Sequence, residues 1–513
     1  MECRNVWKAA GPAAVQVARL ECGQIGYREP MILPMPAPLD PRVRDCLENA
    51  MLLLGEPAIG RWLERFQGLY QALDESARLA LFDHLAIDME INSAAMPGAA
   101  SAGGAEAPWD AEKGMAAMAR QAAILDRPLD LDGPGAGETV DRLLRLREGL
   151  ESPRLHFFRQ FVNVRGGIKF LVDMRADLLA AMRHHRDRPA WRLVDADLLH
   201  LFRTWFNHGF LRLVPINWHR TPAAQLEKLM AFDVVHPMSD WADLRRRLDR
   251  DRLCFGFYHP NLPEEPLIFV EVALTRTIAT SIDMLFDPLK MLDRIEDATT
   301  AIFYSINATQ PGLAGVSLGN SLIKMVVEQL GRDYPHIHRF STLSPMPGFR
   351  DRYLLPILAD DAAAARFALT AGKLEAMFDA DDAAAVMQLT GAPTLLAALR
   401  RVLNKDSWAG DRTLRAALKP GLLRAAHFYL TREKRGRDPL NPVAAFHLRN
   451  GAVIYNINFL SNTGAKGMAE SFGMTVNYHY APDHIQANQR RAREGEAAIS
   501  PQLEKMLKLG VSA

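Results

Sequence analysis

The sequence predicts a multidomain α+β protein in which an N-terminal all-helical bundle is followed by an α/β domain. Two observations lead to this prediction. Apolar residues recur at helical spacing through most of the first 195 residues, and short β-rich runs alternate with helical ones after about residue 200. A length of 513 residues with 49% hydrophobic residues is sufficient for several domains with their own cores.

Charge and cysteine content narrow the class of protein. The 61 Lys+Arg residues nearly balance the 60 Asp+Glu residues, so the chain has no overall attraction to nucleic acid or to an anionic membrane surface. Its 4 cysteines form no C-x-x-C pair, which argues against a zinc knuckle or a disulfide framework. The sequence has no long apolar run and no clean signal peptide, so we expect a cytoplasmic protein without a membrane partner.

The helical prediction covers residues 1–195. A segment near 94–106 is rich in glycine and alanine and predicts a flexible loop between helices. The apolar stripes are more extensive than one thin bundle needs, which predicts association between subunits. The clearest stripe consists of Trp62, Leu63, Phe66, Leu69, Tyr70 and Leu73.

The second domain is predicted to cover residues 196–513. Its strands are expected at 253–258, 267–274, 300–306 and 338–343, with a helix over 318–330 between the last two. Helical periodicity returns near 355–435 and predicts a helical insertion in this domain. Residues 446–459 contain Asn450-Gly451 between two apolar runs, which predicts a β-hairpin with a type I′ turn.

A loop of small residues separates the strand predicted at 300–306 from the following helix. Such a loop presents free backbone N–H groups and the positive end of the helix dipole, which suit a pyrophosphate. The sequence has neither the dinucleotide-binding pattern G-x-G-x-x-G nor the P-loop pattern, which counts against a dinucleotide-binding fold and an NTPase, but a coenzyme A pyrophosphate would use the same contacts. The alternative is a tight glycine turn that only caps the helix.

Two isolated polar residues are candidates for catalysis. Ser344 follows the strand predicted at 338–343 and precedes Pro345 and Pro347, whose fixed φ angles predict a rigid segment outside the sheet ladder. His447 lies among apolar neighbours. A turn-initiating serine and a hydrogen-bonded core histidine are the alternative interpretations.

Two further groups of residues have less specific patterns. Arg245, Arg246 and Arg247 predict the solvated face of a helix, with contact to an adenosine phosphate as an alternative. A polar-aromatic group near the C-terminus lacks the spacing of a zinc site; it consists of Tyr478, His479, Tyr480 and His484.

Many short motifs between residues 200 and 480 resemble, in the same order, those of the malonyl-CoA decarboxylase family. They are Trp205-Phe206-Asn207, Val235-His236-Pro237, Glu265-Pro266-Leu267, Ala273-Leu274-Thr275, Ala301-Ile302-Phe303-Tyr304-Ser305-Ile306, Gly315 to Gly319 with Leu322-Ile323-Lys324, Phe340-Ser341 with Leu343-Ser344-Pro345 and Pro347-Gly348-Phe349, and Asn441-Pro442-Val443-Ala444 with Phe446-His447-Leu448 and Asn450-Gly451-Ala452. The resemblance implies a helical domain joined to a catalytic domain of the GNAT-type acetyltransferase fold, a homotetramer or dimer, and a role in fatty acid metabolism.

The resemblance also implies the site residues. The family's catalytic serine and histidine correspond to Ser344 and His447. The acyl-CoA loop of the fold has the pattern [QR]-x-x-G-x-[GA], from which this chain departs by having Ala314 at the first position and Ser317 at the fourth. The implied coenzyme A-binding residues are Ala314, Gly315, Val316, Ser317, Leu318, Gly319 and Asn320.

The chemistry of malonyl-CoA explains these residue types. Its carboxylate lies β to a thioester carbonyl, which accepts the electrons released with CO₂ as an enolate, so we expect no cofactor and no metal. The protein must supply a hydrogen-bond donor, a proton for the α-carbon and a water-poor pocket. We expect His447 to donate the proton and Ser344 to bind the malonyl group and relay the proton. An acyl-CoA-dependent N-acyltransferase on the same fold and a non-catalytic acyl-CoA sensor are the alternatives.

Overall fold

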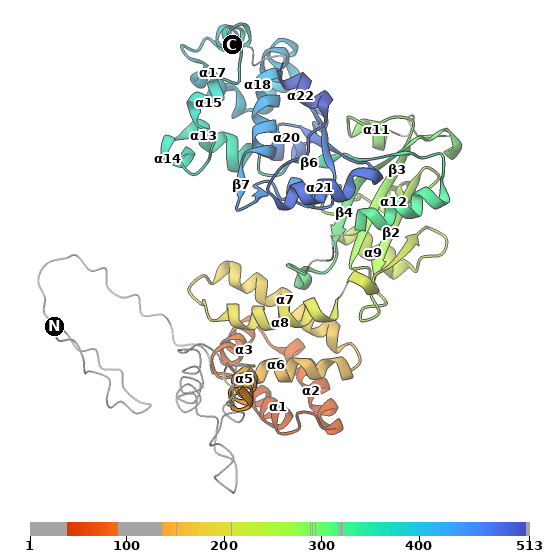
Figure 1. The fold of residues 1–513 in the computed structure, drawn as a ribbon, viewed down its shortest axis with the longest axis vertical. Coiled ribbons are helices and arrows are strands. Elements are labelled where there is room, and N and C mark those ends of the chain that lie inside the picture. Colours follow the sequence, from red (N-terminus) through yellow and green to blue (C-terminus); the bar gives the residue numbers. More distant parts are fainter. Residues whose placement is uncertain are drawn as a thin grey trace, which may run out of the picture.

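The computed structural model describes residues 38–90, 136–149, 151–206, 208–287, 289, 291–292, 294–316, 318 and 322–508. Helices from the N-terminal part form one lobe, below the larger lobe that contains the sheet in the view of Figure 1. The predicted α+β class, with helices first and a mixed sheet after them, is confirmed. The predicted flexible loop near 94–106 lies outside the described residues.

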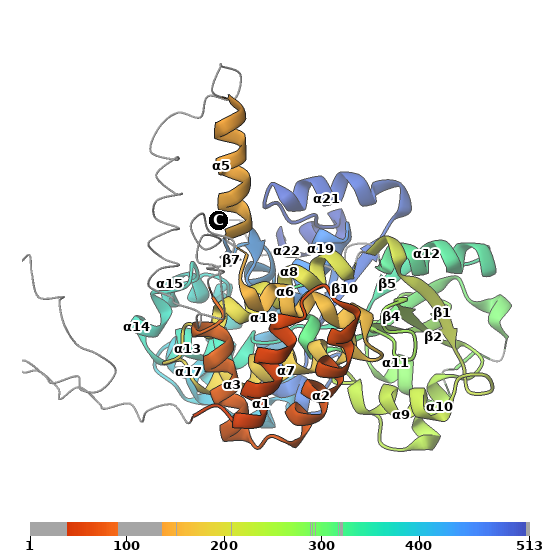
Figure 2. The same ribbon diagram turned by 90° about the horizontal axis from the view of Figure 1, so that it is seen from below.

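Aromatic rings form the core of the helical lobe. Phe66 of α2 contacts Phe157, Phe161 and Phe170 with ring centroids 5.2, 6.2 and 5.9 Å away, all edge to face. Each such pair adds about 0.5–1.5 kcal/mol to the burial of the rings. Figure 2 shows α5 projecting away from the other helices. The helices of this lobe are α1 (Pro41–Leu52), α2 (Gly60–Ala72), α3 (Glu75–Ile87), α5 (Ala136–Gly149), α6 (Pro153–Arg159), α7 (Gly167–His184) and α8 (Trp191–Trp205).

α8 continues across the predicted domain boundary at 195–196, and the first strand of the sheet begins at Arg212. The sheet has the strand order β1-β2-β3-β4-β5-β10-β6, and β9 also pairs with β10. All of these pairs are antiparallel except β4 with β5. The four predicted strands are confirmed as β2 to β5. The strands are β1 (Arg212–Ile216), β2 (Arg252–Tyr258), β3 (Ile268–Thr275), β4 (Thr300–Ala308), β5 (Arg339–Thr342), β6 (Ser344–Pro345), β9 (Val453–Asn458) and β10 (Thr475–Tyr480).

Helices cover both faces of the sheet because successive strand residues point to opposite sides. The apolar side chains of α9 and α10 pack with Phe269 on one face, and those of α12 belong to the core that contains Val270 on the other. The helices around the sheet are α9 (Ala223–Phe232), α10 (Trp241–Arg247), α11 (Asp283–Phe286), α12 (Leu322–Asp333), α19 (Pro442–Arg449), α20 (Ala465–Ser471), α21 (Ile485–Arg493) and α22 (Pro501–Lys508).

β4 and β5 separate part of the way along their length. Their register ends at the pair Phe303 and Thr342, and the next backbone hydrogen bond, from the N–H of Leu343 to the oxygen of Phe303, is 3.1 Å long. Beyond this point β4 continues along β3 to Ala308, whereas the segment that forms β5 stays paired with β10 and continues as β6. The last five residues of β4, about 17 Å of strand, are therefore not paired with β5 or β6, and we call this unpaired edge between β4 and β6 the wedge.

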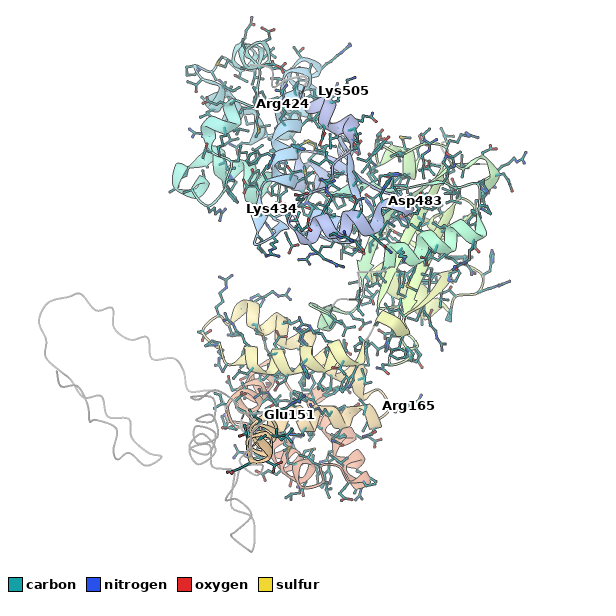
Figure 3. All side chains as sticks on the ribbon, viewed as in Figure 1. Glu151, Arg165, Arg424, Lys434, Asp483 and Lys505 are labelled. Carbon is teal, nitrogen blue, oxygen red and sulfur yellow. The ribbon has the colours of Figure 1, made fainter. Side chains whose placement is uncertain are left out.

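The helical segments predicted near 355–435 form an insertion, and hydrogen bonds join its two ends. The hydroxyl of Tyr353 donates to Oε1 of Glu433 over 2.9 Å, and the same oxygen accepts the N–H of Leu369 over 2.9 Å. The rings of Tyr353 and Tyr429 lie 4.7 Å apart. Figure 3 labels Arg424 on the last helix and Lys434 in the small hairpin of β7 (Lys434–Arg435) and β8 (Asp438–Pro439) that follows it. The helices are α13 (Leu355–Ala359), α14 (Asp361–Ala364), α15 (Ala371–Glu375), α16 (Ala380–Thr390), α17 (Leu395–Leu403) and α18 (Arg412–Thr431).

The predicted hairpin at 446–459 is wrong in its first half. Residues 442–449 form α19, and β9 follows. Asn441 caps the helix by accepting the N–H of Ala444 over 2.8 Å, with Pro442 at the first helical position. Gly451, at φ +85°, ends the helix and does not join two strands. Asn-Gly tolerates the left-handed conformation in both settings, so the dipeptide did not distinguish them.

Within the described ranges, no helix alone has both the length and the apolar character needed to cross a bilayer. Two helices of the insertion, Ala380–Thr390 and Leu395–Leu403, satisfy both criteria only as a pair bent by 59°.

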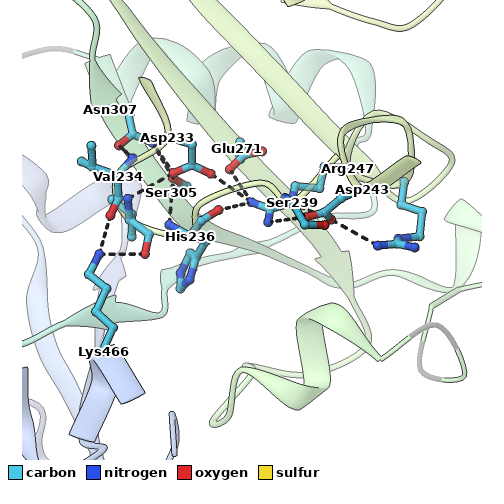
Figure 4. A network of polar contacts seen from close by, with 12 residues as sticks. Asp233, Val234, His236, Ser239, Asp243, Arg247, Glu271, Ser305, Asn307 and Lys466 are labelled. Carbon is cyan, nitrogen blue, oxygen red and sulfur yellow. Dashed lines mark hydrogen bonds and ion pairs between the residues drawn. The ribbon is translucent and has the colours of Figure 1, made fainter. Parts of the chain in front are cut away.

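A buried polar network fixes the segment between α9 and α10 against the sheet (Figure 4). Asp233 accepts hydrogen bonds from Ser305 over 3.0 Å and Asn307 over 2.9 Å, and it pairs with Arg247 at 2.9 Å. Arg247 also lies 3.7 Å from Glu271. The prediction of a solvated arginine face is therefore wrong for Arg247, which is buried; its two neighbours at 245 and 246 are exposed.

Replacing Glu271 with glutamine is expected to change the pH dependence of stability. Burial and the nearby Asp233 carboxylate raise the pKa of Glu271 well above its ordinary value, so the folded protein holds this proton more tightly than the unfolded chain. The wild type therefore loses stability as the pH rises above about 4.5, by up to about 1.4 kcal/mol per pH unit, and Glu271→Gln removes that loss. Chemical denaturation of both proteins at pH 5 and pH 8 measures the difference. Glu264→Gln, at an exposed position, is the control; a constant difference at both pH values would contradict the prediction.

Candidate active site

The structure brings the two predicted catalytic residues into direct contact. Oγ of Ser344 lies 3.0 Å from Nε2 of His447, although the two residues are 103 positions apart in the chain. Ser344 is 6% exposed and His447 is 3% exposed. The pair lies where the wedge between β4 and β6 begins, since Ser344 is the first residue of β6.

Ser344 is held within the sheet, which corrects the prediction of a segment outside the ladder. It pairs with Val476 of β10, and Pro345 pairs with Thr475. β10 also pairs with Phe340 and Ser341 of β5, so the same edge of β10 holds both β5 and β6. Because the interruption between these strands is one residue long, sequence periodicity did not reveal the second pairing.

The turn after Ser344 is tied to the helix that carries His447. The oxygen of Pro347 accepts a hydrogen bond from the hydroxyl of Tyr429 over 3.0 Å and another from Nδ2 of Asn441 over 3.2 Å. Asn441 also caps α19, so one fully buried side chain links the serine turn to the histidine helix. This link explains how the chain keeps the serine and the histidine together.

Two residues that were not predicted to be catalytic complete the hydrogen-bond chain. The hydroxyl of Tyr480 lies 2.7 Å from Nδ1 of His447, and Ser344 donates to Oγ1 of Thr342 over 2.9 Å. The polar-aromatic group at 478–484 contained Tyr480, but its period-2 alternation was the only signal that Tyr478 and Tyr480 share a face. The ring of Tyr478 stacks on the imidazole with a centroid distance of 4.4 Å.

The hydrogen-bond partners of Thr342 indicate which groups donate and which accept along the series from Thr342 to His447. Its hydroxyl donates to the carbonyl oxygen of Val476 over 3.5 Å, because a carbonyl can only accept, and it accepts the N–H of Tyr478 over 3.0 Å. The hydrogen of Ser344 therefore points to Thr342. With the hydroxyl of Ser344 donating to Thr342, we assign a hydrogen to Nε2 of His447, which then donates to Ser344.

The other imidazole nitrogen then accepts a hydrogen bond from Tyr480. Burial lowers the pKa of His447 to about 3, and burial raises the pKa of Tyr480 well above its ordinary value. Both side chains are therefore neutral at neutral pH. The buried imidazole therefore does not titrate near the ordinary histidine pKa of about 6.5.

The predicted coenzyme A loop follows β4, at the far end of the wedge from Ser344. Its described residues are Ala314, Gly315, Val316 and Leu318, whereas Ser317, Gly319 and Asn320 lie outside the described residues. Gly315 has φ +82°, a left-handed conformation that glycine adopts without strain. Among the described residues, no three His, Cys, Asp or Glu side chains are grouped as a metal ion requires.

Family models match most of this chain. One, described as the malonyl-CoA decarboxylase C-terminal domain, matches residues 209–512, and another, described as the malonyl-CoA decarboxylase N-terminal domain, matches residues 135–206.

Two curated relatives carry the name "Malonyl-CoA decarboxylase, mitochondrial". The protein of Anser anser anser is 38% identical over 335 residues, which are 64% of this chain and 64% of the relative. The protein of Rattus norvegicus is 37% identical over 339 residues, which are 66% of this chain and 67% of the relative. The chain thus spans about two thirds of the length of these relatives. Their mitochondrial names do not fit the cytoplasmic location expected for this chain.

Crystal structures of two bacterial proteins named malonyl-CoA decarboxylase resemble the fold. The protein of Rhodopseudomonas palustris has a TM-score of 0.73 and 34% identity, and the match covers 90% of this chain and 98% of that one. The protein of Agrobacterium vitis has a TM-score of 0.72 and 32% identity, with 91% and 99% covered.

Proposed function

The chain belongs to the malonyl-CoA decarboxylase family, and on this premise we propose that it is a carboxy-lyase that converts malonyl-CoA to acetyl-CoA and CO₂. The observation that carries the proposal is the contact between Ser344 and His447 at the head of the wedge. The acyl arm of the substrate would lie along the wedge. The loop residues Ala314 to Asn320 would bind the pyrophosphate at the other end through backbone N–H groups.

In the proposed reaction the bond between the carboxylate and the α-carbon breaks, and its electron pair moves into the thioester carbonyl as an enolate. CO₂ leaves, and the α-carbon then takes up one proton, so each turnover consumes one proton. A neutral imidazole forms no ion pair with the substrate carboxylate. It therefore does not stabilise the ground state that the reaction must leave.

The proton reaches the α-carbon through the hydrogen-bond chain. Ser344 turns its hydroxyl from Thr342 to the enolate and gives up its proton, and Nε2 of His447 replaces that proton. Tyr480 protonates Nδ1 at the same time. Before the next turnover a proton from solvent restores the hydroxyl of Tyr480, and the imidazole returns to the tautomer that carries its hydrogen on Nε2. An enolate is a much stronger base than a phenolate, so the transfer runs toward the α-carbon.

An assay without an amine acceptor separates the proposal from its alternatives. The protein incubated with malonyl-CoA alone is expected to form acetyl-CoA and CO₂ in equal amounts, measured by chromatography and by CO₂ release. An N-acyltransferase would require an acceptor and would release free coenzyme A. A non-catalytic sensor would leave malonyl-CoA unchanged, and that outcome would contradict the proposal.

We also propose that the chain acts as a cytoplasmic homo-oligomer, a tetramer or a dimer, without nucleic acid or membrane partners and without a cofactor. Light scattering is expected to give two or four times the chain mass of 57.2 kDa, and a mass of 57.2 kDa itself would contradict the proposed oligomer.

The neutral state of the imidazole predicts a flat pH profile. Because burial lowers the pKa of His447 to about 3, the free enzyme keeps the same protonation state at this residue throughout the neutral range. We expect kcat/KM for malonyl-CoA to stay constant within about twofold between pH 5.5 and 8, since this parameter reports the free enzyme. Initial rates at low substrate concentration in constant ionic strength provide the measurement. An inflection near pH 6.5 would show an imidazole that titrates normally and would contradict the relay.

A further inference from the structure

An arginine of the helical domain holds the backbone of the loop that precedes α12. Nη1 of Arg175, on α7, donates to the carbonyl oxygens of Gly312 and Ala314 over 2.5 and 2.8 Å. Its Nε pairs with Oδ1 of Asp195, on α8, at 2.7 Å. The arginine side chain is 2% exposed, so solvent does not weaken these contacts.

The loop backbone also packs directly against α7 and α8. A Cβ atom at Gly312 would lie 1.8 Å from the carbonyl oxygen of Val172, so only glycine fits there. A Cβ atom at Gly315 would touch Leu199 of α8 at 3.5 Å. The guanidinium of Arg203, also on α8, lies 3.4 Å from the oxygen of Gly315. The two helices thus contact this loop at three of its backbone positions.

The hydrogen bond from Arg175 to the oxygen of Ala314 determines where the N–H group of Gly315 points. A trans peptide places its carbonyl oxygen and the following N–H on opposite sides. Because Arg175 draws the oxygen of Ala314 toward α7, the N–H of Gly315 faces away from the helical domain. That N–H meets no acceptor within the part of the chain that the structure describes, and φ of +82° keeps Gly315 in this orientation.

We propose that Arg175 is a positioning residue for coenzyme A: through Gly312 and Ala314 it sets the loop so that the N–H of Gly315 is presented to the pyrophosphate. The inference rests on the proposed function of this loop. It assigns to the helical domain a part in substrate binding, because the arginine and its carboxylate partner both come from that domain. Arg175 does not itself touch the substrate in this proposal.

Arg175→Lys tests the proposal. Lysine keeps a cation beside Asp195, but its single nitrogen on a flexible stem does not reproduce the fork that holds two carbonyls and a carboxylate. We expect KM for malonyl-CoA to rise about tenfold, corresponding to the loss of one charge-assisted hydrogen bond. We expect kcat to stay within about twofold.

Malonyl-pantetheine, which lacks the pyrophosphate and the nucleotide, distinguishes positioning from general damage. Its kcat/KM is expected to be the same for Arg175→Lys and wild type. An equal loss with both substrates, or an unchanged KM for malonyl-CoA, would overturn the proposal. Asp195→Asn provides a second test if the lysine variant folds poorly. This change leaves Arg175 in place but removes its charged partner, so KM for malonyl-CoA is expected to rise by a smaller factor than in Arg175→Lys.

Arg154→Lys is the matched control. Arg154 is also a buried arginine of the helical domain, with a side chain 2% exposed, pairs with Asp197 at 2.8 Å and donates to a carbonyl oxygen, that of Leu85, at 2.9 Å. It does not touch the loop, so KM for malonyl-CoA is expected to stay at the wild-type value. A rise equal to that of Arg175→Lys would overturn the proposal.

Calorimetric binding of coenzyme A itself separates this inference from the proposed reaction. Arg175→Lys is expected to weaken coenzyme A binding about tenfold whether or not the protein decarboxylates malonyl-CoA. A wild type that binds coenzyme A without turnover would refute the proposed function alone, whereas equal affinity in both proteins would refute the positioning role alone.

Discussion

Replacing His447 with alanine is expected to lower kcat for malonyl-CoA by about 10²–10⁴, the range in which a positioned general acid contributes. The imidazole touches Ser344 on one side and Tyr480 on the other, so its loss breaks the proton path in the middle. Coenzyme A binding is expected to change by less than twofold, because the loop lies at the other end of the wedge. Acetyl-CoA formation gives the rate, and calorimetry gives the affinity.

Ser344→Ala is expected to produce a loss of the same size, and the double variant is expected to be little worse than either single one. Residues that act as one unit show such non-additive losses. His484→Ala, at an exposed position, is the control for changes of histidine and is expected to retain wild-type turnover. Near-normal CO₂ release by His447→Ala would exclude this mechanism.

Tyr480→Phe is expected to have the second-largest effect, a fall in kcat of roughly 10²–10³. The change removes one oxygen atom and leaves the buried ring in place. Nδ1 of His447 then loses the donor that supplies a proton when Nε2 passes its own to Ser344, so the relay stops at the imidazole.

Tyr478 provides a closely matched control for that experiment. Its ring stacks on the same imidazole at 4.4 Å, is fully buried, and carries a hydroxyl without a hydrogen-bond partner among the described residues. Tyr478→Phe is therefore expected to keep kcat within about twofold. Equal losses in the two variants would show that packing around the histidine matters and that the Tyr480 hydroxyl does not.

Patterns along the sequence predicted much of the fold because periodicity reports local structure. The strand at Thr300–Ala308 and the amphipathic helix at Leu322–Asp333 were predicted within a few residues of their observed bounds. The helix at Pro442–Arg449 was not predicted, although Asn441-Pro442 is a good helix start, because its eight residues are too few for a clear stripe. The Asn-Gly pair after it then suggested a turn between strands.

The site was predicted only in part, because a hydrogen bond between distant segments leaves no periodic signal. The resemblance to a family identified Ser344 and His447, and the structure brings them to 3.0 Å. Thr342 and Tyr480 lie on strands where every second residue faces the core, so nothing local distinguished their hydroxyls. Burial of Arg247 is a similar case, since its carboxylate partner Asp233 is 14 positions away.

The tied ends of the helical insertion have a consequence for how this protein can vary. Tyr353 and Glu433 close a neck between the strand that carries Ser344 and the helix that carries His447, so the chain inside the neck does not determine the spacing of the two residues. Shortened, enlarged or exchanged helices within 380–403, which holds α16 and α17, would leave the neck, and with it the reacting pair, in place. Sequence changes in this part of the molecule can therefore create new binding surfaces, such as one for a regulator, without changing the geometry of Ser344 and His447.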